Sequence, residues 1–459
     1  MKKLFYVLSM LIMFSLLAAP IFNMNVNATQ KIRVGLESQF KSVDSVTINN
    51  KKIYIGYDNK FWDYGFGSNN NFVMSVDKNF YIDPQKTFAM YQDALVQKNN
   101  YIKNGHKAVV CYDGRWMIYI GGYESLEHAQ KDNLIFNGKI IAPDEKKILF
   151  SADENPLITF AKTPLQFKSD EFVKLSKQKY RGIIELGFYD AQKLTAVNVL
   201  DMNEYLYGVV PSEMPASWSK EALKAQCVAA RSYVMTKLNS HKYYDVCDGV
   251  HCQMYLGVNN ESEKVNKLVD ETKDICIYYK GKPVNALFFS SSGGVTEDAQ
   301  NVWSNSVEYL KSRIDTYEKT PKIWTREFTS EQIKQLLAAN KIDIGDVLGI
   351  EVVDYLPSGR ANQICIIGTE GTKMLDKENI RNFFAKSKGG ILESRMFTIE
   401  NKIESGEIDS GNFNCKIIFS GRGYGHGVGM SQYGAKGMAE AGFKFDDILK
   451  FYYAGVEVK

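Results

Sequence analysis

The alternation of apolar and polar positions predicts a small module between about residues 72 and 142. Short β-prone runs alternate there with amphipathic stretches. The expected elements are strand 72–76, a helix following Asp83-Pro84, strands 108–112 and 115–120, a helix capped by Ser125, and strand 138–142. Asp113-Gly114 joins the two central strands as a hairpin turn. The predicted order is β-α-β-β-α-β.

A second region, from about Tyr180 to the end, contains an amphipathic helix that starts at Ser219. Its apolar residues recur at spacings of three and four, at Leu223, Cys227, Ala230, Val234 and Leu238. Ser217 or Ser219 is available as the helix cap, and Glu221 lies in the first turn, where a negative charge is favourable. Mixed strands and helices in this region predict an α+β fold.

The N-terminus has the pattern of an export signal. Lys2 and Lys3 precede an apolar run from Leu4 to Phe22, and Val26-Asn27-Ala28 resembles a cleavage site. The run is also long enough for an uncleaved membrane anchor, and the sequence leaves this alternative open. We therefore expect an exported chain that is cell-wall associated, secreted or anchored to the outer face of the cytoplasmic membrane.

Composition narrows the classes of function. The chain has 459 residues, with 56 Lys and Arg against 53 Asp and Glu, and the net charge of +3 lacks the excess typical of nucleic-acid binders. We expect no nucleic-acid partner. At roughly 100 to 200 residues per domain, the length suggests two or three domains. The seven cysteines, an odd number spread along the chain, do not have the pattern of a disulfide framework, so at most one or two bridges are expected.

Glu213 is the first candidate for catalysis. It lies between Pro211 and Pro215, which restrict the backbone, with Met214 and Trp218 close by. An apolar setting disfavours the charged carboxylate, so the pKa rises and the group can donate a proton to a glycosidic leaving group. The alternative is a solvated glutamate in a loop that precedes the helix.

His241, Cys247, His251 and Cys252 form a candidate metal site. Two imidazoles and two thiols match the ligands of a closed tetrahedral zinc site, which would be structural. Gly249 allows the sharp turn that the adjacent ligands require. A disulfide between Cys247 and Cys252 is the alternative.

A polar turn follows the apolar residues Phe288 and Phe289. Its sequence is Ser290-Ser291-Ser292-Gly293-Gly294, and it can shape a substrate groove. Glu297 and Asp298, just beyond it, are the nearest candidates for a second carboxylate, but acidic residues that follow a turn are expected to be solvated.

Glycine occupies every second position between Gly421 and Gly429, alternating with Arg422, Tyr424 and His426. The run lacks the spacing of a dinucleotide-binding fingerprint. In a strand, its glycines would share one face and let a ligand approach, while the larger side chains would lie on the other face.

The module at 72–145 resembles the SPOR domain. The resemblance rests on the hairpin end Tyr119-Ile120-Gly121-Gly122-Tyr123 and on Ser125-Leu126-Glu127-His128-Ala129. It implies a ferredoxin-like module that binds glycan strands stripped of their stem peptides. A structural insert without binding function is the alternative.

The rest of the chain resembles the SpoIID/LytB (amidase-enhancer) family of stage II sporulation protein D. The segment around Glu213, the cysteine-histidine cluster, the Ser-x-x-Gly-Gly turn and the segment from Gly425 to Gln432 occur in family order. The match runs from Tyr180 to about Gly455, with residues 32–36 as its first strand. The expected domains are a signal or anchor at 1–28, a strand region at 29–71, the SPOR-like module at 72–145 and a catalytic domain at 146–459.

The family resemblance implies a lytic transglycosylase that cleaves the bond between N-acetylmuramic acid (MurNAc) and N-acetylglucosamine (GlcNAc) in peptide-stripped peptidoglycan. The products carry 1,6-anhydro-MurNAc ends. Glu213 would be the catalytic acid, and one carboxylate suffices if the sugar's own 6-hydroxyl attacks the anomeric carbon. His241, Cys247, His251 and Cys252 would hold zinc. Residues expected to contact the sugar are Arg231, Ser290, Ser292, Tyr424, His426 and Gln432.

The expected partners are peptidoglycan glycan strands, a cell-wall amidase and membrane-bound sporulation proteins. The main alternative is a non-catalytic, peptidoglycan-binding enhancer of an N-acetylmuramoyl-L-alanine amidase. A zinc amidase would need an open metal position, which a four-ligand cluster does not offer. A cysteine peptidase is disfavoured because Cys227 lies on the apolar stripe of its helix.

Overall fold

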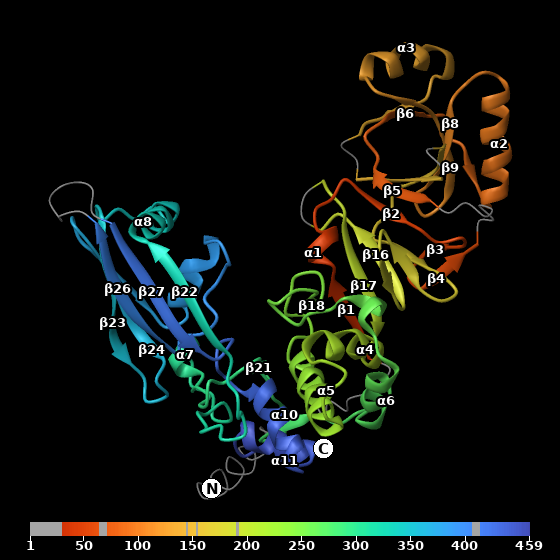
Figure 1. Cartoon of the computed structure of the whole chain (residues 1–459). Helices are drawn as coiled ribbons and strands as arrows, with labels where there is room; N and C mark the ends of the chain where they lie inside the picture. The colour runs from red at the N-terminus through yellow and green to blue at the C-terminus, as the bar shows by residue number, and fades with distance from the viewer. Residues whose placement is uncertain (1–29, 64–70, 144–145, 153–154, 190–191, 406–413) are drawn as a thin grey trace, which may run out of the picture.

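Figure 1 presents the computed structural model of the chain, which describes residues 30–63, 71–143, 146–152, 155–189, 192–405 and 414–459. The expected signal or anchor at 1–28 lies outside these ranges. The fold is α+β with several sheets, as predicted. In the described ranges, no helix combines the length and apolarity needed to cross a bilayer.

A seven-stranded sheet in the described residues supports the candidate site. Its order is β18-β1-β17-β16-β13-β3-β4. The strands are β1 (Lys31–Gly35), β3 (Tyr54–Tyr57), β4 (Lys60–Trp62), β13 (Leu165–Lys168), β16 (Ile183–Gly187), β17 (Thr195–Asp201) and β18 (Val246–Cys247). Strand β1 pairs antiparallel with β17 and parallel with β18. The prediction that residues near 32–36 join the second region as a strand is confirmed.

Helices cover the end of this sheet that carries the candidate residues (Figure 1). They are α4 (Met202–Glu213), α5 (Lys220–Met235), α6 (Glu263–Glu271), α10 (Gln432–Glu440) and α11 (Phe445–Tyr452). Helix α5 contacts α4, α6, α10 and α11. It starts after Ser219, as predicted, but ends at Met235, before Leu238 of the apolar stripe. Its buried residues belong to the main hydrophobic core.

The module forms part of a larger sheet with the order β10-β6-β9-β8-β12-β11-β5-β2-β14-β15. Its own elements are β6 (Phe80–Asp83), β7 (Thr87–Phe88), α2 (Tyr91–Lys103), β8 (Ala108–Tyr112), β9 (Trp116–Tyr123), α3 (Leu126–Phe136) and β10 (Lys139–Ile141). The remaining strands are β2 (Ser45–Ile48), β5 (Phe72–Val76), β11 (Ile148–Ala152), β12 (Asn155–Phe160), β14 (Val173–Leu175) and β15 (Gln178–Tyr180). Strands β10, β6, β9 and β8 are antiparallel neighbours, and the element order β-α-β-β-α-β agrees with the prediction.

Two details of this module differ from the prediction. Its first strand is β6, whereas strand 72–76 is β5 and pairs with β2 and β11 outside the module. Asp83 does not cap a helix, because its carboxylate accepts from the backbone N–H of Gln85 at 2.7 Å, and Gln85 has a φ of 58°. The chain turns there and α2 begins only at Tyr91.

A second lobe, at the left of Figure 1, has a hydrophobic core of its own. It contains two three-stranded sheets, β22-β27-β26 and β23-β24-β25, in the described residues. Its elements are β22 (Ile323–Thr329), α8 (Ser330–Ala339), β23 (Val347–Tyr355), β24 (Ala361–Gly368), β25 (Thr372–Asp376), α9 (Asn379–Phe383), β26 (Phe397–Ser405) and β27 (Asn414–Arg422). The sequence pattern did not set this lobe apart from the rest of the second region.

Short elements link the lobes and complete the fold. They are α1 (Glu37–Phe40), β19 (Ile277–Tyr279), β20 (Lys282–Pro283), β21 (Phe288–Phe289), α7 (Gln300–Trp303), β28 (Met430–Ser431) and β29 (Glu457–Val458). All seven cysteines fall in described residues, and all are free thiols. Cys227 is fully buried, as its place on the apolar stripe predicted, and burial raises its pKa to about 12.

Candidate active site and metal centre

Glu213 is the last residue of α4, so it does not lie in the solvated loop that was the alternative. Pro211 lies inside the helix, and the Ser212 hydroxyl donates to the Gly208 carbonyl at 2.7 Å. A proline inside a helix removes one backbone hydrogen bond and crowds the preceding turn, and α4 ends two residues later, at Glu213. The partial negative charge of a helix C-terminus disfavours a carboxylate at this position.

Two groups hold the half-buried Glu213 carboxyl. The backbone N–H of Met254 donates to its Oε1 at 2.8 Å, and the Gln432 side chain donates a second hydrogen bond. Burial raises the pKa of Glu213 above its ordinary value, and the two hydrogen bonds partly oppose this rise. A raised pKa favours the protonated form that a general acid needs.

An aromatic pair lies beside this acid. The rings of Trp218 and Tyr433 meet edge to face, with centroids 5.0 Å apart. Tyr433 follows Gln432 in α10, and Lys264 Nζ donates to the carbonyl of Trp218 at 2.9 Å. Trp218 is half-buried and Tyr433 is 41% exposed, so the pair offers an accessible aromatic surface next to Gln432, which contacts Glu213.

The Ser-Gly-Gly turn is built around the carboxylate of Glu318. That carboxylate accepts from the hydroxyls of Ser291 and Ser292, and from the backbone N–H of Ser292 at 2.6 Å. Ser292 is fully buried, which corrects its predicted role in substrate binding, because its hydroxyl already has a partner inside the fold. Ser290 is half-buried, and its carbonyl accepts from the backbone N–H of Tyr433 at 3.0 Å.

Glu297 was expected to be solvated and is instead 2% exposed. Its carboxylate accepts from Asn301 Nδ2 at 2.9 Å and from the Ser358 hydroxyl. It therefore connects the turn to the second lobe.

The glycine-rich run is a strand only as far as Arg422, where β27 ends. Gly423, Gly425, Gly427 and Gly429 all have positive φ, between 81° and 110°, so the expected strand with two distinct faces does not form. A left-handed residue at every second position breaks the pleat, and glycine adopts that conformation without steric cost.

The loop directs Tyr424 and His426 differently. Tyr424 is 42% exposed and exchanges two backbone hydrogen bonds with Ser291, at 2.8 and 3.0 Å. The ring of His426 packs near Phe289 and Trp303, at centroid distances of 5.5 and 5.1 Å. Tyr424 can reach a ligand, whereas His426 stabilises the loop.

His426 is a neutral imidazole. Its Nδ1 accepts from the backbone N–H of Val428 at 3.1 Å, which leaves the proton on Nε2. Burial, together with the positive charges of Arg381 and Arg360, lowers the pKa of His426 to about 3. This residue therefore does not act as a proton donor of the imidazolium type at neutral pH.

Arg231 is fully buried, which corrects its predicted role in orienting the sugar. Its NH1 donates to the carbonyls of Thr272 and Ile275 at 2.8 and 3.1 Å, and its NH2 donates to the carbonyl of Val269 at 3.3 Å. The guanidinium group instead joins α5 to the C-terminal end of α6 and the loop beyond it.

The cysteine-histidine cluster is assembled as predicted. The ligand atoms of His241, Cys247, His251 and Cys252 all lie within 4.8 Å of one another. Cys252 Sγ is 3.3 Å from His241 Nε2 and 3.4 Å from His251 Nδ1, and Cys247 Sγ is 3.8 Å from His251 Nδ1. Bond lengths of about 2.0 to 2.3 Å place tetrahedral zinc ligands about 3.3 to 3.8 Å apart, so the donor set fits a zinc ion.

The N-terminal strand β1 holds the segment from His241 to Cys252, called the metal loop here, in its position. Cys247 pairs with Gly35 of β1, and the backbone N–H of Asp248 donates to the carbonyl of Gly35 at 3.1 Å. The Asp248 carboxylate in turn accepts from the hydroxyl and backbone N–H of Ser38 at 2.9 and 3.0 Å. The loop therefore depends on residues about two hundred positions earlier in the chain.

The metal loop leads directly to the acid. Gln253, which follows Cys252, accepts from the Tyr205 hydroxyl at 3.0 Å and donates to the Ala230 carbonyl at 3.3 Å. Met254 is next and holds Glu213. The sequence offered no signal for Met254, because only its backbone N–H takes part.

Gln226 was also missed. It is fully buried in α5, and neither atom of its amide has a hydrogen-bond partner among the described residues. Two contacts place the segment from Cys252 to Met254 along α5. Cys252 is hydrogen-bonded to Tyr233, and Gln253 donates to the carbonyl of Ala230, which lies nearer the N-terminus of the helix. The segment therefore runs toward the N-terminus of α5. Gln226 lies one turn before Ala230 on the same side of the helix, so it continues the face of α5 that the 252–254 segment follows.

Two family models match the chain. One is described as Stage II sporulation protein (SpoIID) and covers residues 190–279, which include Glu213, Met254 and the metal cluster. The other is a domain of unknown function (DUF8618) at residues 310–429, which corresponds to the second lobe.

Curated relatives extend the match. The amidase enhancer of Bacillus subtilis is 35% identical over 291 residues, which cover 54% of this chain and 39% of that protein. An uncharacterized protein of Brachyspira hyodysenteriae is 33% identical over 301 residues, covering 65% of this chain and 77% of its own length. Stage II sporulation protein D of Bacillus subtilis is 32% identical over 287 residues, which cover 57% of this chain and 76% of that protein. The chain therefore belongs to the SpoIID family of stage II sporulation protein D.

Proposed function

We propose that the chain is a lytic transglycosylase that cleaves MurNAc–GlcNAc bonds in peptide-stripped peptidoglycan and leaves 1,6-anhydro-MurNAc ends. The observation that carries this proposal is the Glu213 carboxyl, whose pKa burial raises and whose position Met254 and Gln432 fix by hydrogen bonds. The role would be in spore engulfment or in remodelling of the cell wall, outside the cytoplasm.

The chemistry needs one carboxyl group. Glu213 protonates the glycosidic oxygen as the bond to the anomeric carbon breaks, and the resulting carboxylate then accepts the proton of the sugar's 6-hydroxyl as that oxygen attacks the same carbon. Glu297 and Glu318, the buried carboxylates of the Ser-Gly-Gly turn, are hydrogen-bonded within the fold and are not required for a step. The Trp218–Tyr433 pair supports one sugar ring.

The metal cluster supports the acid from a distance. His241, Cys247, His251 and Cys252 would hold a zinc ion in a closed, structural site. A bound zinc ion would supply fixed geometry to the loop. Two residues that follow the cluster hold the acid in place. Gln253 is hydrogen-bonded to both α4 and α5, and Met254 positions Glu213.

The module at 72–145 is proposed to bind the same stripped glycan. Its sheet order and helices agree with the expected β-α-β-β-α-β pattern. A binding module on the same chain raises the local concentration of substrate at Glu213.

A second candidate function is a non-catalytic enhancer of a cell-wall amidase. The relative named amidase enhancer, at 35% identity, favours it. Such a protein would bind peptidoglycan and act through the amidase, and Glu213 would be dispensable.

One experiment separates the two functions. The purified full-length protein and its Glu213→Gln variant are incubated with peptidoglycan that an amidase has stripped, and the released sugars are analysed by mass spectrometry. Anhydro-muramyl products that form with the unmodified protein and disappear in the variant are the expected result. If neither protein releases sugars but both sediment with the glycan, the transglycosylase proposal is wrong and the enhancer function replaces it.

A further inference from the structure

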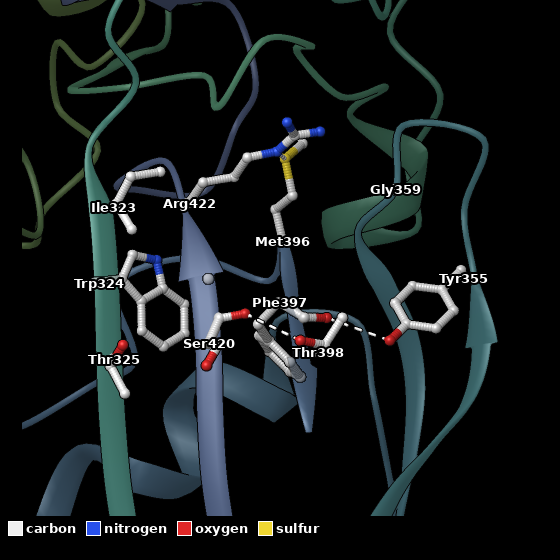
Figure 2. Close-up of a pocket in the computed structure, with 11 residues that line it drawn as sticks. Ile323, Trp324, Thr325, Tyr355, Gly359, Met396, Phe397, Thr398, Ser420 and Arg422 are labelled. Atoms are coloured by element: carbon white, nitrogen blue, oxygen red, sulfur yellow. Dashed lines mark hydrogen bonds between the residues drawn. The ribbon is translucent and has the colours of Figure 1, made fainter. Parts of the chain in front are cut away.

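A pocket of about 580 Å³ opens on the second lobe. Its lining residues lie between Ile323 and Arg422, more than one hundred positions after Glu213 in the sequence. Figure 2 shows it over the β22-β27-β26 sheet, between Trp324 on β22 and Tyr355 on β23. Trp324, Gly421 and Phe397 are cross-strand neighbours in three adjacent strands. The candidate functions described above make no use of this pocket.

The pocket is built to hold a flat, partly apolar group. A side chain at position 421 would collide with the indole of Trp324, so Gly421 is what allows the ring to lie across the sheet. The Trp324 Nε1–H donates to the Ser394 hydroxyl at 3.3 Å. The Tyr355 hydroxyl donates to the Phe397 carbonyl at 3.3 Å, as Figure 2 shows. Both aromatic side chains are thus fixed before a ligand arrives, which lowers the entropy cost of binding.

The rim of the pocket is positively charged. Arg422 is exposed, and its Nε lies 3.1 Å from the sulfur of Met396. Among the described residues, its guanidinium group has no carboxylate partner within ion-pair distance. Lys322, next to the pocket-lining Ile323, has its Nζ 4.0 Å above the ring of Tyr424 and likewise forms no ion pair with a described residue. Two cations beside an aromatic pocket favour an anionic ligand.

The pocket is connected to the acid by one short stretch of chain. From Arg422 the glycine loop reaches Tyr424, which hydrogen-bonds Ser291. The same loop leads into α10, where Gln432 contacts Glu213 and the backbone N–H of Tyr433 donates to Ser290. A single polymeric ligand that touches Glu213 and Tyr424 is therefore directed toward Arg422.

We infer that this pocket is a glycan subsite for a muramyl residue whose lactyl carboxylate is free, and that Arg422 pairs with that carboxylate. The inference rests on the proposed function, because it assumes that the ligand is the stripped strand. An amidase that cleaves the bond between the lactyl group and the stem peptide turns a neutral amide into a carboxylate. Arg422 would then select stripped strands from those that still carry peptides.

The test measures binding and not cleavage, so that it is independent of the proposed reaction. Full-length protein carrying Glu213→Gln is titrated with soluble, amidase-stripped glycan strands, and in parallel with the same strands after their carboxyl groups have been reduced to alcohols. A second protein carries both Glu213→Gln and Arg422→Gln, and it is titrated with the same two glycans. A third protein carries Glu213→Gln and Lys341→Gln. Lys341 is an exposed lysine after α8 in the same lobe, so this variant is the matched control for the loss of one positive charge.

The expected result is that Arg422→Gln weakens binding to the native strands by about tenfold or more and leaves binding to the reduced strands unchanged. Lys341→Gln should change neither. Equal affinity of the Arg422→Gln variant and its parent for native strands would overturn the inference, and so would an equal loss on both glycans. If the binding difference is found but the unmodified protein releases no anhydro sugars, the subsite stands and only the proposed reaction fails.

Discussion

The backbone N–H of Met254 donates to Oε1 of Glu213 at 2.8 Å, and this bond joins the metal loop to the candidate acid. Met254 follows Cys252 and Gln253, and Gln253 is tied to both α4 and α5. A backbone donor cannot be removed by changing its side chain, so its position depends on the loop that carries it. The metal cluster and the acid therefore form one structural unit.

Glu213→Gln should abolish cleavage without harming the fold. Burial raises the pKa of Glu213, so the folded state disfavours the ionised form. The folded protein is therefore most stable when Glu213 is protonated. This stability is lost as the pH rises through the pKa that Glu213 has in the folded state. The glutamine variant avoids this loss and should unfold at an equal or higher temperature at pH 7 than the parent protein. Thermal unfolding and sugar release measure the two effects.

Glu263→Gln is the control for this change. Glu263 is an exposed carboxylate on α6 paired with Lys267. Its replacement should leave cleavage unchanged. A Glu213→Gln protein that still forms anhydro sugars, or that unfolds well below its parent, would contradict the assignment.

Gln432→Leu should shift the pH dependence of cleavage upward. The Gln432 side chain stabilises the ionised form of Glu213 and lowers its pKa, so losing that hydrogen bond raises the pKa further. Because the acid must be protonated, activity falls as the pH rises through this pKa. The alkaline limb of kcat/KM against pH should therefore move to higher pH in the variant. A limb that stays in place or moves to lower pH would show that Gln432 does not act on Glu213.

Metal removal should destabilise the site. Zinc bound by the four ligands would stabilise the folded state by about 2.7 kcal/mol when free metal is at a hundredfold its Kd. Chelation or Cys247→Ser should lower the unfolding temperature, expose the loop between 239 and 255 to protease, and reduce cleavage. Metal content is measured by elemental analysis.

Cys365→Ser provides the matched control for the metal prediction. Cys365 is a buried free thiol in the second lobe, outside the cluster. This variant should keep the metal content of the parent. Equal metal content in the Cys247→Ser and Cys365→Ser proteins would contradict the assigned ligands.

Gln226→Met should stabilise the protein. A buried amide without partners costs about 1 to 3 kcal/mol, and methionine fills a similar volume without that cost. Gln253→Met is the contrasting variant, because it leaves the buried Tyr205 hydroxyl without its acceptor and should destabilise the fold by a similar amount. A lower unfolding temperature for Gln226→Met would show that its amide has a partner.

Local patterns in the sequence predicted several elements well. The apolar spacing from Leu223 onward placed the start of α5, and Asp113-Gly114 placed the β8–β9 hairpin. The cysteine-histidine cluster was also predictable, because its ligands are close in sequence and their chemistry is specific to metals. Prediction of helix starts from capping residues was less reliable. Asp83 accepts a hydrogen bond from the backbone N–H of Gln85 in a turn and does not cap a helix.

Local sequence patterns identified the side chains that can do chemistry, among them Glu213, Gln432 and the metal ligands. Which of these side chains lie together depends on how the chain packs in three dimensions. Arg231 and Ser292 have the right chemical groups but use them inside the fold, whereas Met254 takes part through its backbone alone. Burial and long-range hydrogen bonds decide these outcomes, and neither depends on the residues adjacent in sequence.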